Sequence, residues 1–244
     1  MPKFFVPHEN IGDDRAYIRG GDANHIARVL RARVGEQLVI CDGAGSDYIC
    51  EISDISTEEI NLSIIEKTPC DAEPDVKITL FMALPKSDKM EYVIQKAVEL
   101  GVYEIIPFSA SRCVVKLDSK SGEKKTERWQ KIAHSAAKQS GRGIIPKVSA
   151  PITFGELVKK ATDFELPLFC YECEEENSLK KVLSDKNFEK ICVVVGPEGG
   201  FDRAEVEQAQ ESGFISVSLG KRILRCETAP GCAICAILYH TDNL

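Results

Sequence analysis

The stretch Val193-Val194-Val195-Gly196-Pro197-Glu198-Gly199-Gly200-Phe201 predicts a buried strand that runs into a glycine-rich loop. Consecutive valines favour a strand whose two faces are both covered. Glycines let backbone N–H and C=O groups come close to a ligand. A capping box, Asp202-Arg203-Ala204-Glu205, follows and predicts the start of a helix. This order is typical of a ligand site at the carboxyl end of a strand in an α/β sheet.

A second segment extends this prediction. Leu219-Gly220-Lys221-Arg222-Ile223-Leu224-Arg225-Cys226-Glu227-Thr228-Ala229 follows the next expected strand, residues 214–219. Alone, the first loop would be a tight turn, since it lacks both Gly-Lys-Ser/Thr and G-x-G-x-x-G. Alone, the second would be a helix lead-in with surface charges. Together they predict one pocket, because the carboxyl ends of parallel strands meet at one edge of a sheet.

Strand and helix signals alternate through the C-terminal region. Apolar runs predict strands at residues 76–82, 103–108, 166–171, 191–195 and 214–219. Apolar residues at helical spacing predict helices around Met90–Val98 and Trp129–Ala137. Thr228 with Pro230 is a typical start of a last helix. The alternation predicts an α/β fold with a mostly parallel sheet and helices on both of its faces.

The first 70 residues have the pattern of a small β-rich domain. Residues 39–52 hold two apolar runs around a glycine turn, which predicts a hairpin, and residues 25–30 predict a short helix. A linker is expected at residues 71–75, which are polar and contain Pro74. The expected domains are therefore residues 1–70 and 76–244.

Charge is unevenly distributed along this acidic chain, whose net charge is −7. Residues 111–147 hold only three acids, Asp118, Glu123 and Glu127. The basic residues of the same segment are Arg112, Lys116, Lys120, Lys124, Lys125, Arg128, Lys131, Lys138, Arg142 and Lys147. Such a zone indicates a polyanion-binding surface. A solvated helix face explains it about equally well.

Cysteine usage and hydropathy indicate a cytoplasmic protein without a metal. The ten cysteines include two C-x-x-C pairs, Cys170/Cys173 and Cys232/Cys235. The first pair lies at a strand end, where residues three apart point to opposite faces. The second lies in an apolar helix and is expected to be buried. Disulfides are not expected, since the start of the chain has no signal sequence. No apolar run approaches the roughly 18 residues that a membrane span needs.

The two C-terminal loops resemble two signature motifs of the SPOUT RNA methyltransferases. The match is close to the family that methylates N3 of a uridine in 16S ribosomal RNA, often called RsmE. It rests on Gly-Pro-Glu-Gly-Gly at 196–200 and Arg-Ile-Leu-Arg-Cys-Glu-Thr-Ala at 222–229. Further similar segments are Leu84-Pro85-Lys86, Met90-Glu91, Gln95-Lys96, Glu99-Leu100-Gly101-Val102, Ser111-Arg112, Gln139-Ser140-Gly141-Arg142 with Pro146, Phe4-Phe5-Val6 and His25–Arg31.

The chain departs from the family pattern at three positions. Lys3 stands where arginine is expected, which keeps the charge but loses planar phosphate recognition. Cys226 and Cys232 stand where small residues are expected, and neither should disturb cofactor binding.

The resemblance implies a SPOUT-type α/β knot, with a C-terminal trefoil knot, preceded by a PUA-like β-barrel. It also implies a homodimer that takes S-adenosylmethionine as cofactor and acts on 16S rRNA or the small ribosomal subunit. The implied cofactor-binding residues are Gly196, Glu198, Gly199, Leu219, Gly220, Ile223, Leu224 and Arg225.

Catalysis needs a cation near the acceptor, because loss of the N3 proton leaves negative charge on the uracil ring. Arg225 is the first candidate, with Arg112 and Arg142 as rivals across the dimer. Glu198 is a proton acceptor or a residue that orients the loop. The expected RNA-binding residues are Arg28, Arg31, Arg33, Lys86, Arg112, Lys138 and Arg142.

Two other functions are compatible with the same motifs. One keeps the knot and methylates a ribose 2′-hydroxyl in ribosomal or transfer RNA. The other is a non-catalytic RNA-binding protein with a degenerate cofactor pocket.

Overall fold

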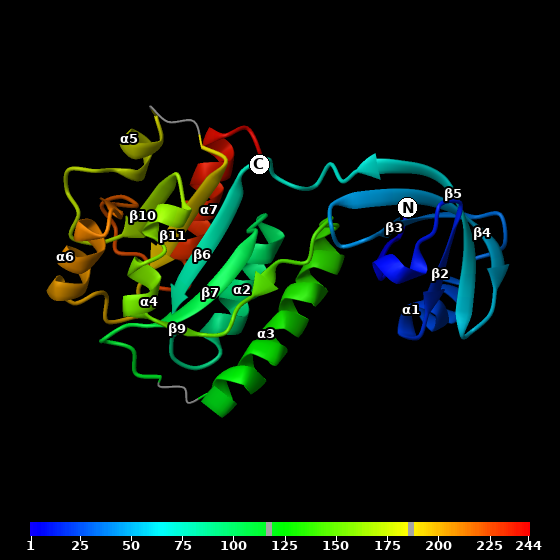
Figure 1. The fold of residues 1–244 in the computed structure, drawn as a ribbon, viewed down its shortest axis with the longest axis horizontal. Coiled ribbons are helices and arrows are strands. Elements are labelled where there is room, and N and C mark those ends of the chain that lie inside the picture. Colours follow the sequence, from blue (N-terminus) through cyan, green and yellow to red (C-terminus); the bar gives the residue numbers. More distant parts are fainter. Residues whose placement is uncertain (116–118, 185–187) are drawn as a thin grey trace. The chain divides into compact units, whose positions relative to one another are not determined.

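The computed structural model describes residues 1–115, 119–184 and 188–244 and divides the chain into two compact units (Figure 1). The first unit is Met1–Glu73 with Ala137–Ile145, and the second is Pro74–Ala136 with Pro146–Leu244. The first boundary lies inside the expected linker. The return of residues 137–145 to the first unit was not predicted. Lys116 and Asp118 of the basic segment lie outside the described residues.

The first unit is built on a five-stranded sheet in the order β1-β3-β4-β5-β2. The strands are β1 (Lys3–Phe5), β2 (Arg15–Arg19), β3 (Gln37–Cys41), β4 (Ser46–Ile55) and β5 (Glu59–Pro69). The predicted hairpin is confirmed, since β3 and β4 pair antiparallel with Val39 opposite Ile49. The register of β4 and β5 shifts at Ile49/Cys50 and Ile52/Asp54. Such irregularities bend a sheet, which helps this one to enclose a core.

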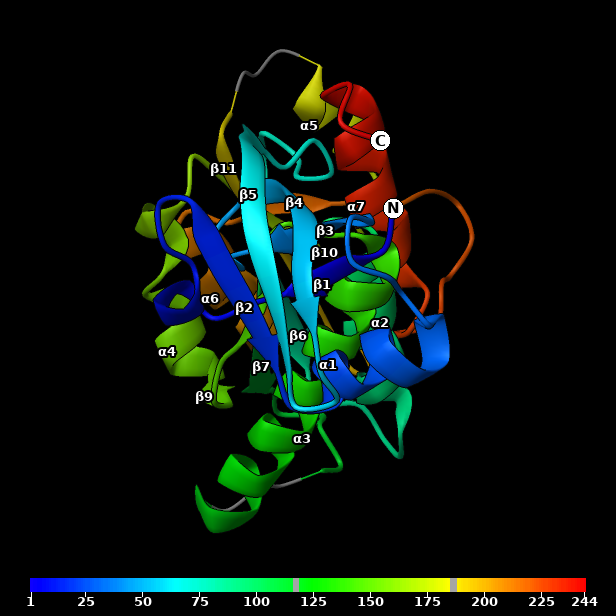
Figure 2. The ribbon, with the colours of Figure 1, turned by 90° about the vertical axis from the view of Figure 1, so that its right-hand side faces the viewer.

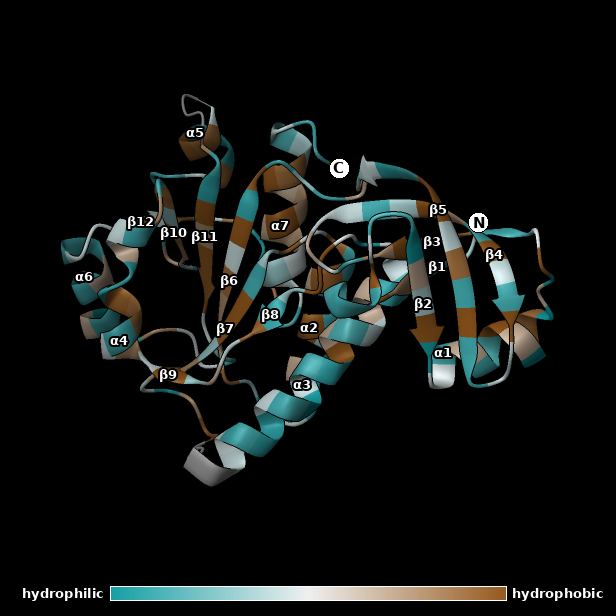
Figure 3. Cartoon of the chain, turned by 45° about the vertical axis from the view of Figure 1, so that its right-hand side comes forward, coloured by the Kyte–Doolittle hydropathy of each residue, from teal (hydrophilic) through white to brown (hydrophobic). Residues whose placement is uncertain are grey.

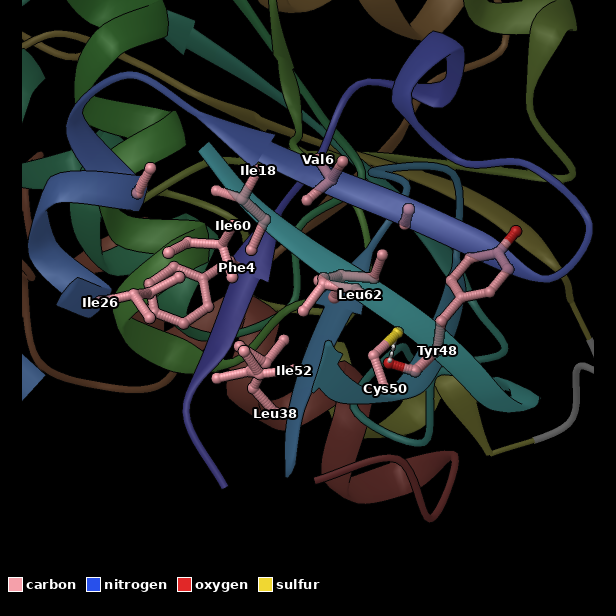
Figure 4. Close-up of a cluster of buried hydrophobic side chains, with 13 residues drawn as sticks. Phe4, Val6, Ile18, Ile26, Leu38, Tyr48, Cys50, Ile52, Ile60 and Leu62 are labelled. Atoms are coloured by element: carbon pink, nitrogen blue, oxygen red, sulfur yellow. Dashed lines mark hydrogen bonds between the residues drawn. The ribbon is translucent and has the colours of Figure 1, made fainter. Parts of the chain in front are cut away.

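Alternating side chains of this sheet meet in one apolar cluster (Figure 4). Ile18, Ile60 and Leu62 come from β2 and β5, and Leu38 and Ile52 come from β3 and β4. Period-two alternation places these side chains on one face of each strand. The cluster is therefore the hydrophobic core of the first unit.

A short helical segment covers one end of this core, as predicted. It consists of α1 (Gly21–Asn24) and η2 (His25–Leu30), and η2 has π-helical geometry. Ile26 is fully buried in the core, whereas Arg28 is exposed. The helix ends at Arg31, which has a left-handed backbone with φ of 52°. The remaining short turn of this unit is η1 (His8–Asn10).

Residues 141–144 wrap around the carboxylate of Glu73. Its Oε1 accepts from the backbone N–H groups of Gly143 (2.6 Å) and Ile144 (3.0 Å) and from Nε of Arg142 (2.9 Å). Its Oε2 accepts from Nη2 of Arg142 at 2.7 Å. A carboxylate with four donors fixes the returning segment to the end of the first unit.

Arg142 therefore holds the fold of the first unit, which argues against its predicted contact with RNA or the reacting base. Its side chain is only 3% exposed and forms a bidentate pair with Glu73. A guanidinium buried in this way is not presented to a phosphate.

The ammonium group of Lys3 is also held by partners within the first unit. Its Nζ donates to Asp47 Oδ2 (2.8 Å), the Cys70 sulfur (3.1 Å) and the Gly141 carbonyl (3.1 Å). An ammonium has three rotatable donors, which suits three acceptors of this kind. The lysine thus fits a position where the family resemblance led us to expect arginine.

The second unit contains a parallel sheet in the order β12-β10-β11-β6-β7-β8, with β9 paired to β7. The strands are β6 (Lys77–Ala83), β7 (Glu104–Ser109), β8 (Lys147–Val148), β9 (Ile152–Thr153), β10 (Leu166–Cys170), β11 (Lys190–Val195) and β12 (Ile215–Val217). The five predicted strands are confirmed to within a few residues. In β6 and β11 every residue after the first is buried, so both faces of these strands are covered.

Helices cover both faces of this sheet, as expected. Figure 2 shows α4 and α6 on one side of it and α2 and α7 on the other. The helices are α2 (Lys89–Glu99), α3 (Ser119–Ser140), α4 (Phe154–Val158), α5 (Leu179–Leu183), α6 (Arg203–Glu211) and α7 (Ala229–His240), with a short turn η3 (Ala161–Asp163). In Figure 3 the strands between them are largely hydrophobic, whereas much of α3 is hydrophilic.

The helix-start signals are confirmed in part. Asp202 and Glu205 form the predicted capping box of α6. Thr228 stands directly before α7, but its side chain accepts no capping hydrogen bond. The expectation that Cys232 and Cys235 are buried was wrong, because Cys232 is exposed and Cys235 half-buried. The buried residues of α7 are instead Ala229, Pro230, Ala233, Ile234, Ile237 and Leu238.

Residues 1–115, 119–184 and 188–244 contain neither a membrane-spanning helix nor a metal-binding cluster. No helix there is long and apolar enough to cross a membrane. No group of three or more His, Cys, Asp or Glu residues there is arranged to hold a metal ion.

Replacing Arg142 with methionine should destabilise the first unit by about 3 kcal/mol, because Glu73 would remain largely buried without its cation. Hydrogen exchange at the Gly143 and Ile144 amides should accelerate accordingly. Arg128→Met is the control, since Arg128 forms an exposed pair with Glu91 and should cost less than about 1 kcal/mol. Equal effects of the two variants on urea unfolding would contradict a structural role for Arg142.

Candidate active site

A cavity of about 520 Å³ lies at the carboxyl edge of the parallel sheet. It is lined by residues that end or follow β10, by the loop after β11 and by the loop after β12. Lys89 at the start of α2 and Ala229 at the start of α7 complete the lining. The predicted convergence of the two C-terminal loops on one pocket is therefore present in the structure.

The cavity brings together all the residues proposed for the cofactor. Gly196, Glu198, Gly199, Leu219, Gly220, Ile223, Leu224 and Arg225 all line it. Ile223 is 87% exposed at its edge, beside exposed Lys221 and Arg222. The second loop thus presents apolar and cationic side chains at the mouth of the cavity.

Phe201 explains why the first loop begins with glycine. A Cβ on Gly196 would lie 2.9 Å from the Phe201 ring. That ring is buried against Phe108, Phe154 and Phe169, with centroid separations of 6.4, 6.3 and 4.2 Å. An aromatic ring held on several sides has little room to move. Gly196 is therefore required for the loop to pass over Phe201.

The loop after β7 braces the first cofactor loop. Arg112, in that segment, donates from Nη1 to the carbonyl oxygen of Gly199 at 2.9 Å. Glu205 of α6 accepts from the backbone N–H of Ser111 (2.7 Å), from its hydroxyl (2.9 Å) and from the N–H of Asp202 (3.0 Å). The predicted Ser111-Arg112 segment thus holds the first cofactor loop through hydrogen bonds to Gly199 and Glu205.

The backbone of Arg225 is held by hydrogen bonds, whereas its side chain is exposed. Its carbonyl oxygen accepts from the N–H groups of Thr228 (2.9 Å) and Ala229 (3.0 Å) at the entry to α7. Within the described part of the chain, its guanidinium has no hydrogen-bond or ion-pair partner. A cation of this kind is available to a ligand in the cavity, in contrast to the engaged guanidinium of Arg112.

Glu198 is held as an anion. Its Oε1 accepts from Nζ of Lys89 (3.0 Å) and from the backbone N–H of Lys86 (3.1 Å). Burial raises the pKa of this carboxyl, but its own backbone N–H, Lys89 and Lys86 outweigh burial and leave that pKa below its usual value. A carboxylate with a lowered pKa is a weak base. The contacts therefore favour the orienting role of Glu198 over proton acceptance.

Lys89 was missed by the sequence analysis, although it lines the cavity. Its Nζ lies 3.1 Å from Oε2 of Glu227 as well as near Glu198. These carboxylates raise the pKa of the Lys89 ammonium above its usual value. The signal available in the sequence was a lysine at the first position of a helix, where a cation opposes the helix dipole.

The residues predicted to bind RNA fall into two groups. Arg28, Arg31 and Arg33 in the first unit, and Lys86 and Arg112 in the second, are exposed. Lys138 instead forms an ion pair with Asp22 and lies over the Phe4 ring at 5.3 Å from its centroid. Lys138 resembles Arg142 in having partners within its own unit.

Comparison with known proteins agrees with this geometry. Residues 72–238 match a family described as RNA methyltransferase domain, and residues 18–65 match RNA methyltransferase PUA domain. Ribosomal RNA small subunit methyltransferase E of Bacillus subtilis (strain 168) is 39% identical over 93% of this chain and 91% of its own length. This chain belongs to the ribosomal RNA small subunit methyltransferase E family.

Further relatives of the methyltransferase E family cover most of the chain. The protein of that name from Mesomycoplasma hyopneumoniae (strain 232) is 39% identical over 84% of this chain and 86% of its own length. A crystal structure of the Neisseria gonorrhoeae enzyme bound to S-adenosyl methionine is 33% identical, with a TM-score of 0.84 and coverage of 98% and 97%. The fold of the methyltransferase E family thus extends over both units.

Gly196→Ala should weaken S-adenosylmethionine binding by about fivefold or more, because overpacking against a fixed ring costs about 1–3 kcal/mol. Isothermal titration calorimetry measures this loss. The double variant Gly196→Ala/Phe201→Leu should recover part of the affinity, since a smaller side chain leaves room for the new methyl. Gly155→Ala in α4 is the control, because its Cβ would meet nothing within 4 Å. Unchanged affinity in Gly196→Ala would refute the packing argument.

Proposed function

We propose that this chain transfers the methyl group of S-adenosylmethionine to N3 of a uridine in 16S ribosomal RNA. The observation that carries the proposal is the cavity that the Gly196–Phe201 and Leu219–Cys226 loops share. Membership of the methyltransferase E family supplies the substrate class. The solved Neisseria relative, bound to S-adenosyl methionine, supports the cofactor.

The residues of the cavity fit this cofactor. A volume of about 520 Å³ lies within the usual range of small-molecule sites. Gly196, Gly199 and Gly220 expose backbone groups to the cavity, which suits a polar adenosyl or amino-acid moiety. Leu219, Ile223 and Leu224 offer apolar contact to adenine. The cofactor would supply a methyl group activated by its positive sulfur.

Of the three arginines predicted to be catalytic, Arg225 is the best placed. Uridine N3 must lose its proton, and negative charge then spreads over O2 and O4 of the ring. A guanidinium that is free of protein partners can stabilise that charge as it forms. Arg112 holds the Gly199 carbonyl and Arg142 is buried in the first unit. These contacts make Arg112 and Arg142 weaker candidates, and Glu198 is proposed to orient the loop.

The first unit provides an exposed basic surface for RNA. Arg28, Arg31 and Arg33 project from the end of η2 and the residues after it, beside exposed Val29 and Val34. Phosphates would bind the guanidinium groups and set the register of the RNA. The first unit is thus proposed to hold the ribosomal RNA while the second unit carries out methyl transfer.

We also propose that the chain forms a homodimer. Tyr239 and Leu244, at and after the end of α7, are 76% and 74% exposed, and Cys232 is exposed on the same helix. They line a second concave surface of about 880 Å³ together with Leu179 and Leu183. Apolar exposure of this kind marks an interaction surface. A monomer in sedimentation at micromolar concentration would contradict the homodimer.

The trefoil knot and the compartment remain proposals. The order β12-β10-β11 supports a knot, because β10 lies between two strands that follow it in the chain. An experimental chain trace without a crossing would contradict it. Action on ribosomal RNA supports a cytoplasmic location, which fractionation of cells would test.

Arg225→Ala should lower kcat by about 10²–10³, as expected for loss of one charge-stabilising group, while Arg225→Lys retains part of the activity. Mass spectrometry of nucleosides from treated ribosomal RNA should detect 3-methyluridine with the wild-type chain. Arg203→Ala is a control, since Arg203 forms an exposed pair with Glu207 on α6. A methyl group on the ribose would support 2′-O methylation, and no methylated nucleoside would support a binding protein.

Charge reversal at Arg31 and Arg33 should weaken RNA binding without affecting S-adenosylmethionine binding. The slope of log K against log salt should lose roughly 1.5 units in magnitude, because two phosphate contacts are removed. Fluorescence anisotropy with labelled RNA measures the RNA affinity and its salt dependence. Lys67→Glu on β5 is the control for charge reversal. Equal loss of RNA and cofactor binding would mean that the surface is misplaced or the first unit has unfolded.

A further inference from the structure

Lys89 forms ion pairs with acids from both cofactor loops. Its Nζ lies 3.0 Å from Oε1 of Glu198, in the loop after β11, and 3.1 Å from Oε2 of Glu227, in the loop after β12. The sulfur of Cys226 is 3.8 Å from the same nitrogen. One ammonium thus contacts two loops that leave the sheet from different strands.

The sheet itself leaves these loops separate. β11 and β12 are not neighbours, because β10 lies between them. Among the hydrogen bonds and ion pairs of the described residues, none joins residues 196–201 directly to residues 219–228. Lys89 is therefore the polar link by which α2 ties one loop to the other.

The carboxylates make this link necessary. Both Glu198 and Glu227 approach the same ammonium, so each would face the charge of the other if the ammonium were removed. Glu198 keeps the backbone N–H of Lys86 at 3.1 Å and its own backbone N–H. Glu227 keeps its own backbone N–H and the thiol of Cys226, whose sulfur lies 3.2 Å from Oε2. None of these remaining donors carries a positive charge, so repulsion between the two carboxylates would push the loops apart.

Local helix preference does not account for Lys89. It is the first residue of α2, where a positive charge opposes the helix dipole. The cost of a lysine at this position must be offset by contacts outside the helix. The two carboxylates of the cofactor loops are those contacts.

We infer that Lys89 is a positioning residue that holds the two cofactor loops in register for S-adenosylmethionine. The inference rests on the proposed function in one respect, that the cavity between the loops takes this cofactor. Lys89 acts through Glu198 and Glu227 and does not touch the uridine.

Four variants test the inference in the full-length chain. Lys89→Met removes the charge at similar length. Lys89→Arg retains it. Lys89→Met/Glu227→Gln removes the ammonium together with one of the two repelling charges. Lys96→Met is the matched control, because Lys96 lies on the same helix and, among the described residues, pairs only with Glu99, three residues away.

Cofactor affinity and kinetics give the first readout. Lys89→Met should raise both Kd and KM for S-adenosylmethionine by about tenfold or more, since two charge-assisted bonds are lost. KM for RNA should stay unchanged, and kcat at saturating cofactor should fall much less. Lys89→Arg and the double variant should each recover most of the affinity. Equal affinity in Lys89→Met and Lys96→Met, or no recovery in either rescue variant, would overturn the inference.

Hydrogen exchange without cofactor gives the second readout. Lys89→Met should accelerate exchange at the amides of both loops, while amides of the sheet keep their protection. If the loop amides of Lys89→Met keep the protection of the wild-type chain, Lys89 does not hold the two loops together, whatever the activity of the variant. If Lys89→Met accelerates exchange in both loops but the wild-type chain binds no S-adenosylmethionine, the proposed function fails and the role of Lys89 in holding the loops remains.

Discussion

The parallel pairing of β10, β11 and β12 is the constraint on which the site depends. Strands that run in the same direction all end at one edge, so the loops after β11 and β12 must emerge side by side around the end of β10. Burial on both faces of β11 fixes that edge within a rigid layer. Loops positioned by such a layer can present backbone groups to a ligand with little rearrangement. The direction of the strands thus determines where the cavity lies, and the side chains determine its shape.

Side chains then hold the loops at that edge. The Phe201 ring packs beneath Gly196, Arg112 bonds to the carbonyl of Gly199, and Glu205 joins the end of the β7 segment to the start of α6. None of these groups needs to take part in methyl transfer. They leave Arg225 as a cation without a protein partner in the described residues, at a cavity that glycines and aliphatic side chains line together with charged groups such as Lys89 and Glu198. The division between residues that hold the loops and a residue that is available to the substrate follows from these contacts.

Much of this arrangement could be predicted from the sequence, because it depends on local patterns. Val193–Val195, the glycines and the capping box at Asp202 identify the strand, the loop and the helix. Tertiary partners could not be predicted. Arg142 and Lys138 resemble RNA-binding residues in the sequence, but each pairs with an acid distant along the chain, Glu73 and Asp22. The position of Lys89 between two loops, and the return of residues 137–145 to the first unit, likewise depend on contacts between distant segments.

A crystal structure of the chain grown with S-adenosylmethionine tests the central claim most directly. The account predicts electron density for the cofactor between Gly196–Phe201 and Leu219–Cys226, with its backbone contacts from these loops and the Arg225 guanidinium facing the methyl group. Density for the cofactor at another place on the chain, or a cleft filled by the side chains of the two loops, would contradict the account.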